Sequence, residues 1–227
     1  VIANIENLAH GKGITESTFK EVQEAGIDVF TSGNHIFDKK DGFPLLDNKK
    51  LPIVRPANYP PGVPGRGFTS VTVKGRKITI INLMGRVFMR QDLEDPFRAF
   101  DEIIKGIPAK NLVVVDFHAE TTSEKRAFGF YAAGRANVVF GTHTHIATAD
   151  VDTITEHKMG YVTDAGMVGA RDSILGVEKS GVLQQFLTQM PVKHTMLEAG
   201  PIVFNSVLAE ITEKTCTAIE RCDKTLE

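Results

Sequence analysis

The sequence has few cysteines and no long apolar run. Its 227 residues include two cysteines, Cys216 and Cys222, which lie near the C-terminus and far from every other candidate ligand. This placement favours two reduced thiols over a disulfide or a metal clip. No apolar stretch approaches the roughly 18 residues of a transmembrane helix, and no signal peptide is visible. We therefore expect a cytoplasmic protein that has no membrane partner.

An excess of charge and several catalytic motifs are also missing. The formal net charge is −2, which gives no electrostatic reason to expect binding to duplex nucleic acid. A small anionic ligand stays compatible with this charge, because a bound metal can supply local positive charge. The sequence contains no Walker A loop, no G-x-S-x-G elbow, no H-E-x-x-H and no C-x-x-C, so the enzyme classes that depend on these motifs are disfavoured.

The chain contains short apolar runs that alternate with capped helical segments. Thr15 can cap one helix, with Ile14 and Phe19 at the staple positions, and Asp95-Pro96 is a typical start for another. Strands are expected at 1–4, 27–31, 68–73, 77–83, 111–117, 137–140, 161–163 and twice within 203–221 around Glu213-Lys214, and helices at 15–25, 95–106, 122–133 and 180–188. This order predicts one layered α/β domain over residues 1–227, with a proline-rich stretch at 51–67 that is an ordered loop or a crossing segment.

Polar side chains gather where the predicted strands end. In open α/β sheets, ligands bind outside the carboxyl ends of the strands, so these loops can converge on one site. A single histidine after a strand is more often structural than a ligand, but four of the seven histidines fall at strand ends. The candidate site residues are Glu6, Asn7, Asn34, His35, His118, His143 and His145, whereas His10, His157 and His194 are expected in loops or on the surface.

This set of side chains suits two divalent metal ions. Imidazole binds Fe, Mn or Zn well, and carboxylate and amide oxygens add hard ligands. We expect Fe or Mn, with Zn or Mg also compatible. Glu6 has two oxygens and can bridge two ions. Two-metal sites hold their ions about 3.5–4 Å apart and clamp the attacking and leaving oxygens of a phosphoryl displacement.

Six motifs, in chain order, resemble one family. They are Asn-x-Glu-Asn-x-x-His-Gly-Lys-Gly at 4–13, Gly-Asn-His at 33–35, Arg-Pro-Ala-Asn at 55–58, Asp-Phe-His-Ala-Glu-x-Thr-Ser-Glu-Lys at 116–125, Gly-Thr-His-Thr-His at 141–145 and Thr-Asp-x-Gly-Met at 163–167. Over almost its whole length the chain resembles the YmdB-type bacterial metallophosphoesterases of the calcineurin-like superfamily. Gly-Asn-His and Gly-x-His-x-His belong to the wider superfamily, and the His-Gly-Lys-Gly and Asp-Phe-His-Ala-Glu stretches are much more specific to this family.

The resemblance implies a fold, a metal centre and an activity. It implies a four-layer α/β/β/α sandwich with a dinuclear centre that hydrolyses 2′,3′-cyclic nucleotides, notably 2′,3′-cyclic AMP, at the 2′ bond. By position, Glu6 resembles the bridging ligand and His145 a ligand of the first metal, while His35 resembles the acid that protonates the leaving oxygen. The family's ligands of the second metal correspond by position to Asn7, Asn34, His118 and His143.

Two features depart from the family pattern. The family's first strand ends in Gly-Asp-x-x-Gly, whose Asp binds the first metal, and this sequence opens instead at Val1-Ile2-Ala3-Asn4. We therefore expect an N-terminally truncated chain whose first metal lacks one ligand. Ile5 also replaces the glycine that usually precedes the glutamate, which adds bulk beside the site.

Other functions stay open at this stage. Within the family, the chain can be a phosphatase or nucleotidase of broader specificity. From another class, it can be a signalling protein that acts through partners and holds a purely structural metal. The role of His35 separates the enzyme from the signalling protein. A structural metal site has closed coordination and needs no free acid, whereas a catalytic site keeps an open position. A metal-free α/β domain is disfavoured by the convergence of strand-end ligands, and the sequence leaves open whether the chain forms a homo-oligomer.

Overall fold

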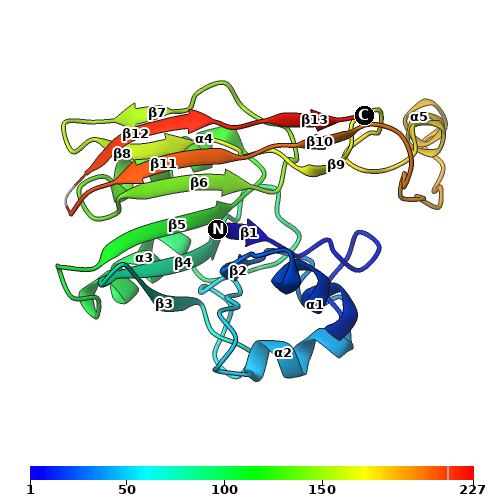
Figure 1. Cartoon of the computed structure of the whole chain (residues 1–227). Helices are drawn as coiled ribbons and strands as arrows, with labels where there is room; N and C mark the ends of the chain where they lie inside the picture. Colours follow the sequence, from blue (N-terminus) through cyan, green and yellow to red (C-terminus); the bar gives the residue numbers. More distant parts are fainter. Residues whose placement is uncertain (214) are drawn as a thin grey trace.

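A six-stranded mixed sheet forms the centre of the computed structural model, which describes residues 1–213 and 215–227 (Figure 1). Its strands, in spatial order, are β3 (Phe68–Val73), β4 (Arg76–Met84), β5 (Leu112–His118), β6 (Val138–Thr142), β8 (Met159–Val162) and β7 (Asp152–Ile154). The four inner strands are parallel, and the two edge strands pair antiparallel. Every residue of β5 is buried, as its continuous apolar run predicts for a strand covered on both faces.

Two helices, α3 (Pro96–Lys105) and α4 (Thr122–Ala132), cover one face of this sheet. Phe128 of α4 stacks on Phe117 of β5 with ring centroids 4.2 Å apart. Because side chains alternate along a strand, Val115 and Phe117 face the helices while Val114 packs in the cluster on the opposite face.

The opposite face packs against further strands. The hairpin of β11 (Val207–Ile211) and β12 (Cys216–Arg221) covers Val114 of β5 and Val138 of β6. Beside it, β1 (Ile2–Asn4) and β2 (Val29–Thr31) form a parallel pair, with Val29 and Ile80 in one cluster. Cys216 is a buried packing residue, and both cysteines are free thiols, as predicted.

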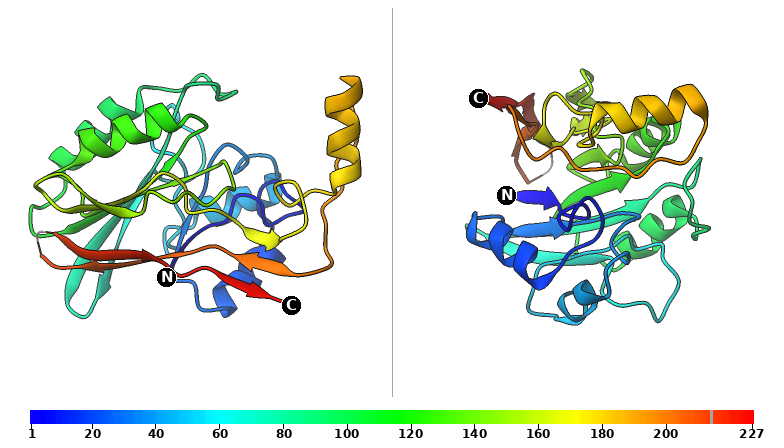
Figure 2. Two further views of the ribbon diagram at one scale, coloured as in Figure 1. Left: turned by 90° about the horizontal axis from the view of Figure 1, so that it is seen from above. Right: turned by 90° about the vertical axis from the view of Figure 1, so that its right-hand side faces the viewer.

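Helices also cover the far side of the β1–β2 pair, which completes four layers (Figure 2). They are α1 (Glu16–Glu24), a 3₁₀ turn η1 (Lys40–Gly42) and α2 (Phe43–Asp47). Thr15 caps α1 in a capping box with Thr18, and Ile14 and Phe19 are buried in the cluster beneath it. The predicted α/β/β/α arrangement is therefore confirmed.

The remaining elements extend one end of the layer that contains the β1–β2 pair and the β11–β12 hairpin. They are β9 (Val168–Ala170), β10 (Ile202–Phe204) and β13 (Lys224–Leu226), which form an antiparallel sheet, and α5 (Lys179–Thr188), which projects from the body (Figure 2). Within residues 1–213 and 215–227, no helix combines the length and hydropathy needed to cross a membrane.

Most predicted elements are confirmed, and the differences have a common cause. The short elements η1, α2, β7, β9, β10 and β13 span three to five residues, too few to produce a readable hydrophobic period. The tail consequently contains four strands where two were predicted. His118 and Thr142 end their strands and do not follow them, because parallel pairing with each other extends both. The turn predicted at Glu213-Lys214 falls partly outside the described residues, which omit position 214.

Candidate metal centre

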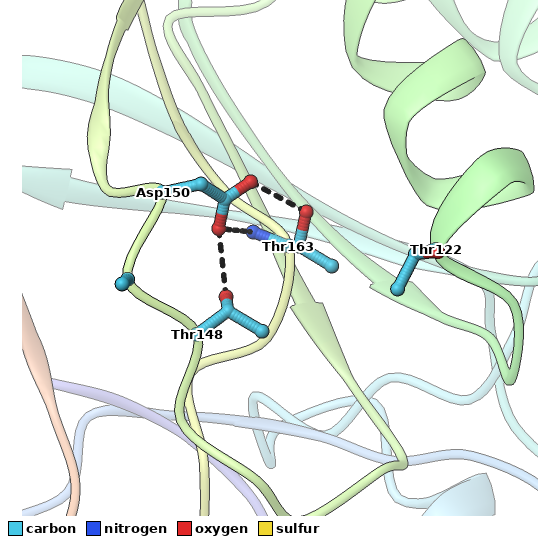
Figure 3. Close-up of a pocket in the computed structure, with 5 residues that line it drawn as sticks. Thr122, Thr148, Asp150 and Thr163 are labelled. Carbon is cyan, nitrogen blue, oxygen red and sulfur yellow. Dashed lines mark hydrogen bonds between the residues drawn. The ribbon is translucent and has the colours of Figure 1, made fainter.

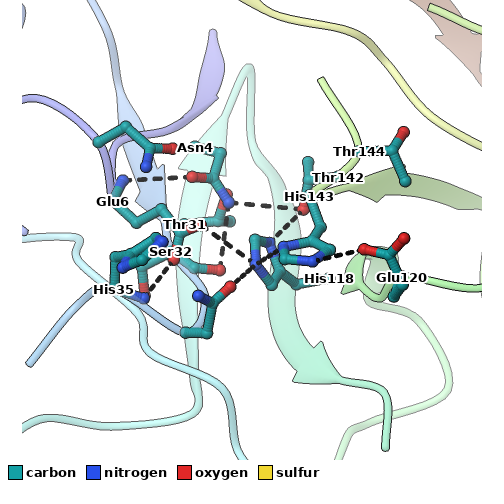
Figure 4. A network of polar contacts seen from close by, with 12 residues as sticks. Asn4, Glu6, Thr31, Ser32, His35, His118, Glu120, Thr142, His143 and Thr144 are labelled. Atoms are coloured by element: carbon teal, nitrogen blue, oxygen red, sulfur yellow. Dashed lines mark hydrogen bonds and ion pairs between the residues drawn. The ribbon is translucent and has the colours of Figure 1, made fainter. Parts of the chain in front are cut away.

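The candidate site lies where β1, β2, β5 and β6 end (Figure 4). Asn4 and Thr31 are paired at the ends of β1 and β2, and His118 and Thr142 at the ends of β5 and β6. Asn4 joins the two sheets, since its Nδ2 lies 3.3 Å from Asp116 Oδ2 and 3.5 Å from Thr142 Oγ1. The loops that follow these strands therefore meet at one site, as predicted, but they leave two sheets and not the single sheet that was expected.

Three potential ligand atoms surround one ring nitrogen of His118. Nε2 of His118 lies 3.1 Å from Glu6 Oε1, 3.1 Å from His143 Nδ1 and 2.8 Å from Asn34 Oδ1. Ligand atoms of Glu6, His118 and His143 all lie within 4.8 Å of one another. Since a ring nitrogen can donate at most one hydrogen bond, His118 cannot satisfy all three neighbours.

The partners of the two histidines explain why their nitrogens point toward each other. Thr142 Oγ1 donates to Asp116 Oδ1 at 2.7 Å, so its oxygen accepts from His118 Nδ1 at 2.9 Å. The other ring, His143, has its Nε2 2.9 Å from Glu120 Oε2. When both rings are neutral, each carries its proton on the outer nitrogen and turns a lone pair inward, as the hydrogen-bond partners of metal-binding histidines require.

This donor set fits a divalent cation. Metal–nitrogen and metal–oxygen bonds of about 2.0–2.2 Å place ligands at right angles about 3 Å apart. The separations of 2.8–3.1 Å around His118 Nε2 match this spacing. One carboxylate, one amide oxygen and two imidazoles suit Fe, Mn or Zn.

The charges of these groups are strongly coupled. Burial raises the pKa of Glu6, but the charge and hydrogen bond of His118 outweigh burial and lower that pKa to about 2. Burial lowers the pKa of His118, and the charge of Glu6 more than reverses this, so that pKa rises. For His143, burial and then the charge of His118 lower the pKa to about 4. Glu6 is thus ionised and His143 neutral near pH 7, which are the forms that bind metal, whereas the raised pKa of His118 favours its protonated ring, which must lose a proton when a metal binds.

Four supporting residues were not among the predicted site residues: Asn4, Asp116, Glu120 and Thr142. Asp116 is fully buried, and burial raises its pKa to about 6. The sequence did contain a signal for Asp116, because Asp116 and His118 are two residues apart on one strand and therefore lie on the same face. Thr142 depends on the register between β5 and β6, which the sequence alone does not fix.

His35 lies at the rim beside these ligands. Its backbone amide donates to Glu6 Oε2 at 2.8 Å, and its Nδ1 lies 2.8 Å from Asp38 Oδ2. The side chain is 30% exposed. The ring is therefore held through Nδ1, which leaves Nε2 available to a ligand.

Two predicted ligands make other contacts. Asn7 Nδ2 donates to the Gly11 carbonyl at 2.8 Å. The imidazole of His145 lies 3.4 Å from the Leu175 carbonyl through Nδ1. The structure therefore brings together Glu6, Asn34, His118 and His143, and the metal-binding roles of Asn7 and His145 stay predictions.

A buried ion pair fixes the loop that carries His143. Lys125 Nζ lies 2.6 Å from Asp164 Oδ2 and donates to the Thr142 carbonyl at 2.7 Å. The same carboxylate oxygen accepts from the Thr144 amide at 3.1 Å. These contacts hold His143 at a φ of 99°, a conformation that non-glycine residues adopt at a cost of about 1–3 kcal/mol.

A separate shallow pocket of about 480 Å³ lies beyond this loop (Figure 3). Asp150 is its one carboxylate, and it accepts hydrogen bonds from the hydroxyls of Thr148 and Thr163 and from the Thr163 amide. Because these donors satisfy the carboxylate, Asp150 supports the loop and offers little to a ligand.

Comparisons with known proteins agree with the resemblance predicted from the motifs. The model of the family described as YmdB-like protein matches residues 1–222. The chain is 43% identical over 220 residues to the 2′,3′-cyclic-nucleotide 2′-phosphodiesterase of Bacillus subtilis (strain 168), and the match covers 96% of this chain and 82% of that protein.

Two solved structures share the fold over nearly the whole chain. A hypothetical protein from Thermus thermophilus is 40% identical with a TM-score of 0.94, over 99% of this chain and 87% of that one. A structure described as a novel phosphatase from Mycoplasma pneumoniae is 32% identical with a TM-score of 0.91, over 99% and 82% of the two chains. On this evidence, the chain belongs to the YmdB-like family.

Proposed function

We propose that this protein is a metal-dependent phosphodiesterase that opens 2′,3′-cyclic nucleotides by hydrolysing the bond between phosphorus and the 2′ oxygen. The observation that carries the proposal is the meeting of four potential ligand atoms, namely His118 Nε2 and the three atoms of Glu6, Asn34 and His143 that surround it. The activity of the related B. subtilis protein, as its name gives it, supports the substrate class.

The proposed centre holds two divalent ions, Fe or Mn. One ion is assigned to Glu6, Asn7, Asn34, His118 and His143, and the other to Glu6 and His145. When bound, such ions polarise the phosphoryl group and supply a nucleophile at neutral pH. The buried partners Asp116 and Thr142, together with Glu120, orient the ligand rings, since Nδ1 of His118 and Nε2 of His143 are held by hydrogen bonds or ion pairs.

His35 is the proposed general acid. As the bond from phosphorus breaks, negative charge develops on the 2′ oxygen, and a proton must reach it. Asp38 holds the His35 ring through Nδ1, which leaves Nε2 to carry the proton that goes to the leaving oxygen. The overall step adds one water: its hydroxyl oxygen goes to phosphorus and one proton goes to the 2′ oxygen, which leaves a 3′-phosphate.

The test combines product analysis with metal analysis. The protein loaded with Mn²⁺ or Fe²⁺ should convert 2′,3′-cyclic AMP to 3′-AMP, with metal content measured on the same sample. The matched pair is His118→Ala, which removes the central ligand, and His157→Ala, which removes a histidine whose side chain is 52% exposed. The first should lose metal and activity and the second neither. Release of 2′-AMP, or equal metal content in both variants, would contradict the proposal.

A broader phosphatase is the second candidate, and one observation favours it. The M. pneumoniae structure, 32% identical to this chain, is described as a phosphatase. Assays with the cyclic diester and with the monoester 3′-AMP decide between the two. If the monoester is hydrolysed as fast as the diester, broader specificity is correct and free adenosine accumulates.

A further inference from the structure

We infer that Phe88 is a platform on which the base of the nucleotide substrate stacks, an inference that rests on the proposed function. Phe88 lies in the segment between β4 and α3, which leaves the sheet at the same edge as the candidate metal centre. The last residue of β4, Met84, is paired in register with His118, and β4 and β5 run side by side (Figure 1).

Hydrogen bonds tie this segment to two of the proposed ligands. The Gly85 amide donates to the His118 carbonyl at 2.9 Å. Further along, Gln91 Nε2 donates to the Asn34 carbonyl at 3.2 Å. Phe88 lies between these two attachments, so it is held at the rim of the site by contacts on both sides.

Phe88 is exposed in a way that packing does not explain. The residue is 88% exposed, the highest value among the exposed large hydrophobic residues of the described chain. Its φ is 60°, in the left-handed region that a bulky residue rarely adopts. Strained residues of this kind persist where the surroundings determine them and occur most often at ligand sites.

The surroundings of Phe88 do determine its conformation. The Glu124 carboxylate accepts from the Arg86 amide at 2.9 Å and from the Val87 amide at 3.2 Å. Beyond Phe88, the Met89 amide donates to the Arg86 carbonyl at 3.3 Å. The backbone is thus fixed on both sides of Phe88, and the aromatic ring is presented to solvent.

An exposed phenyl ring on a fixed backbone suits a nucleobase. Every base has an apolar π-face that stacks on an aromatic side chain, and removing such a ring weakens binding by roughly 5–150-fold. With the cyclic phosphate at the metal centre, the base projects away from the ions toward the rim. Stacking on Phe88 would then raise affinity for nucleotides over base-free phosphodiesters and would not select strongly among bases.

The experiment compares substrates with and without a base. KM and kcat of the metal-loaded enzyme are measured with 2′,3′-cyclic AMP and with methyl ribofuranoside 2′,3′-cyclic phosphate, and binding of 3′-AMP is measured by calorimetry. Phe88→Ala should raise KM for cyclic AMP about 10–100-fold and weaken 3′-AMP binding similarly. It should leave kcat within about twofold and the base-free substrate unaffected.

Three control variants separate the ring from the backbone. Phe88→Gly removes the ring and the left-handed strain together, and should match Phe88→Ala; Phe88→Trp keeps an aromatic face and should retain affinity. Phe130→Ala, on α4 at a residue that is 54% exposed, should change neither KM nor 3′-AMP binding.

Unchanged KM and unchanged 3′-AMP binding in Phe88→Ala, or an equal loss with the base-free substrate, would overturn the inference. If no variant hydrolyses cyclic AMP but Phe88→Ala still weakens 3′-AMP binding, the platform stands and the proposed reaction fails.

Discussion

Nδ1 of His143 lies 3.1 Å from Nε2 of His118, and the other nitrogen of each ring is held by a separate partner. The raised pKa of His118 favours a proton on the nitrogen that faces the Glu6 carboxylate in the absence of metal. A cation that replaces this proton and binds the folded arrangement of ligands stabilises the fold, so metal binding and folding stability should be linked.

The first prediction concerns that linkage. Adding Mn²⁺ at about 100 times its Kd should stabilise the protein by about 2.7 kcal/mol, and a chelator should reverse the gain. His118→Ala should lose the metal-dependent rise in Tm, whereas His157→Ala should keep it. Calorimetry with and without metal measures both. A metal-dependent rise that persists in His118→Ala would remove His118 from the ligand set.

The second prediction concerns His35. His35→Ala should lower kcat about 10²–10⁴-fold, the usual contribution of a general acid, while KM and metal content stay near wild-type values. An ester whose leaving group needs no proton, such as a p-nitrophenyl ester, should be much less affected. Asp38→Asn should give a smaller loss, because it removes only the partner of Nδ1. The acid role fails if both substrates slow equally or if metal is lost with the rate.

The third prediction concerns the buried ion pair behind the His143 loop. Lys125→Met leaves Asp164 buried and without its cation, and should lower the free energy of unfolding by about 3–5 kcal/mol. The control is Lys105→Met, which breaks the exposed Lys105–Glu102 pair and should change stability very little. Urea unfolding of both variants measures the difference. Equal stabilities would show that the buried pair does not hold the loop.

The fourth prediction concerns close approach of the backbone at Gly33. A Cβ at this position would collide with the imidazole of His118. Gly33→Ala should therefore displace the ring and weaken metal binding about 10–100-fold, as loss of a supporting contact does. Gly106→Ala is the matched control, since its nearest neighbour to a new Cβ is the Ile103 carbonyl at 3.6 Å. Titration of metal into both variants decides the point, and equal affinities would contradict it.

The fifth prediction concerns pH and the C-terminal strands. Hydrogen bonds from Arg221, at 2.6 and 2.8 Å, lower the pKa of Asp223 to about 2, against about 3.9 in an unfolded chain. A depressed pKa stabilises the fold above the unfolded value and stops doing so as pH falls through the folded value. The Tm difference between wild type and Asp223→Asn should thus be constant above about pH 5 and narrow below about pH 4. A difference independent of pH down to about 3 would contradict the assignment.

The sequence by itself determined the order of the main layers and the set of potential ligands. Capping residues and apolar periods have local causes, so Thr15 and Asp95 marked α1 and α3, and the apolar run before His118 marked a strand buried on both faces. Polar residues after parallel strands of one sheet meet at one edge, so order along the chain already grouped Glu6 with Asn34 and His118 with His143; the packing of the two sheets brought the pairs together.

Tertiary structure alone decided how those ligands are oriented and which residues support them. The pairing of His118 with Thr142 depends on the register of two strands 24 residues apart in sequence, and no local pattern encodes that register. The contact of Glu120 with His143 and the ion pair behind the loop likewise join segments that only packing brings together. The exposure of Phe88 has the same origin, because its loop is held by hydrogen bonds to Glu124, 36 residues further along the chain, and no local pattern encodes that contact.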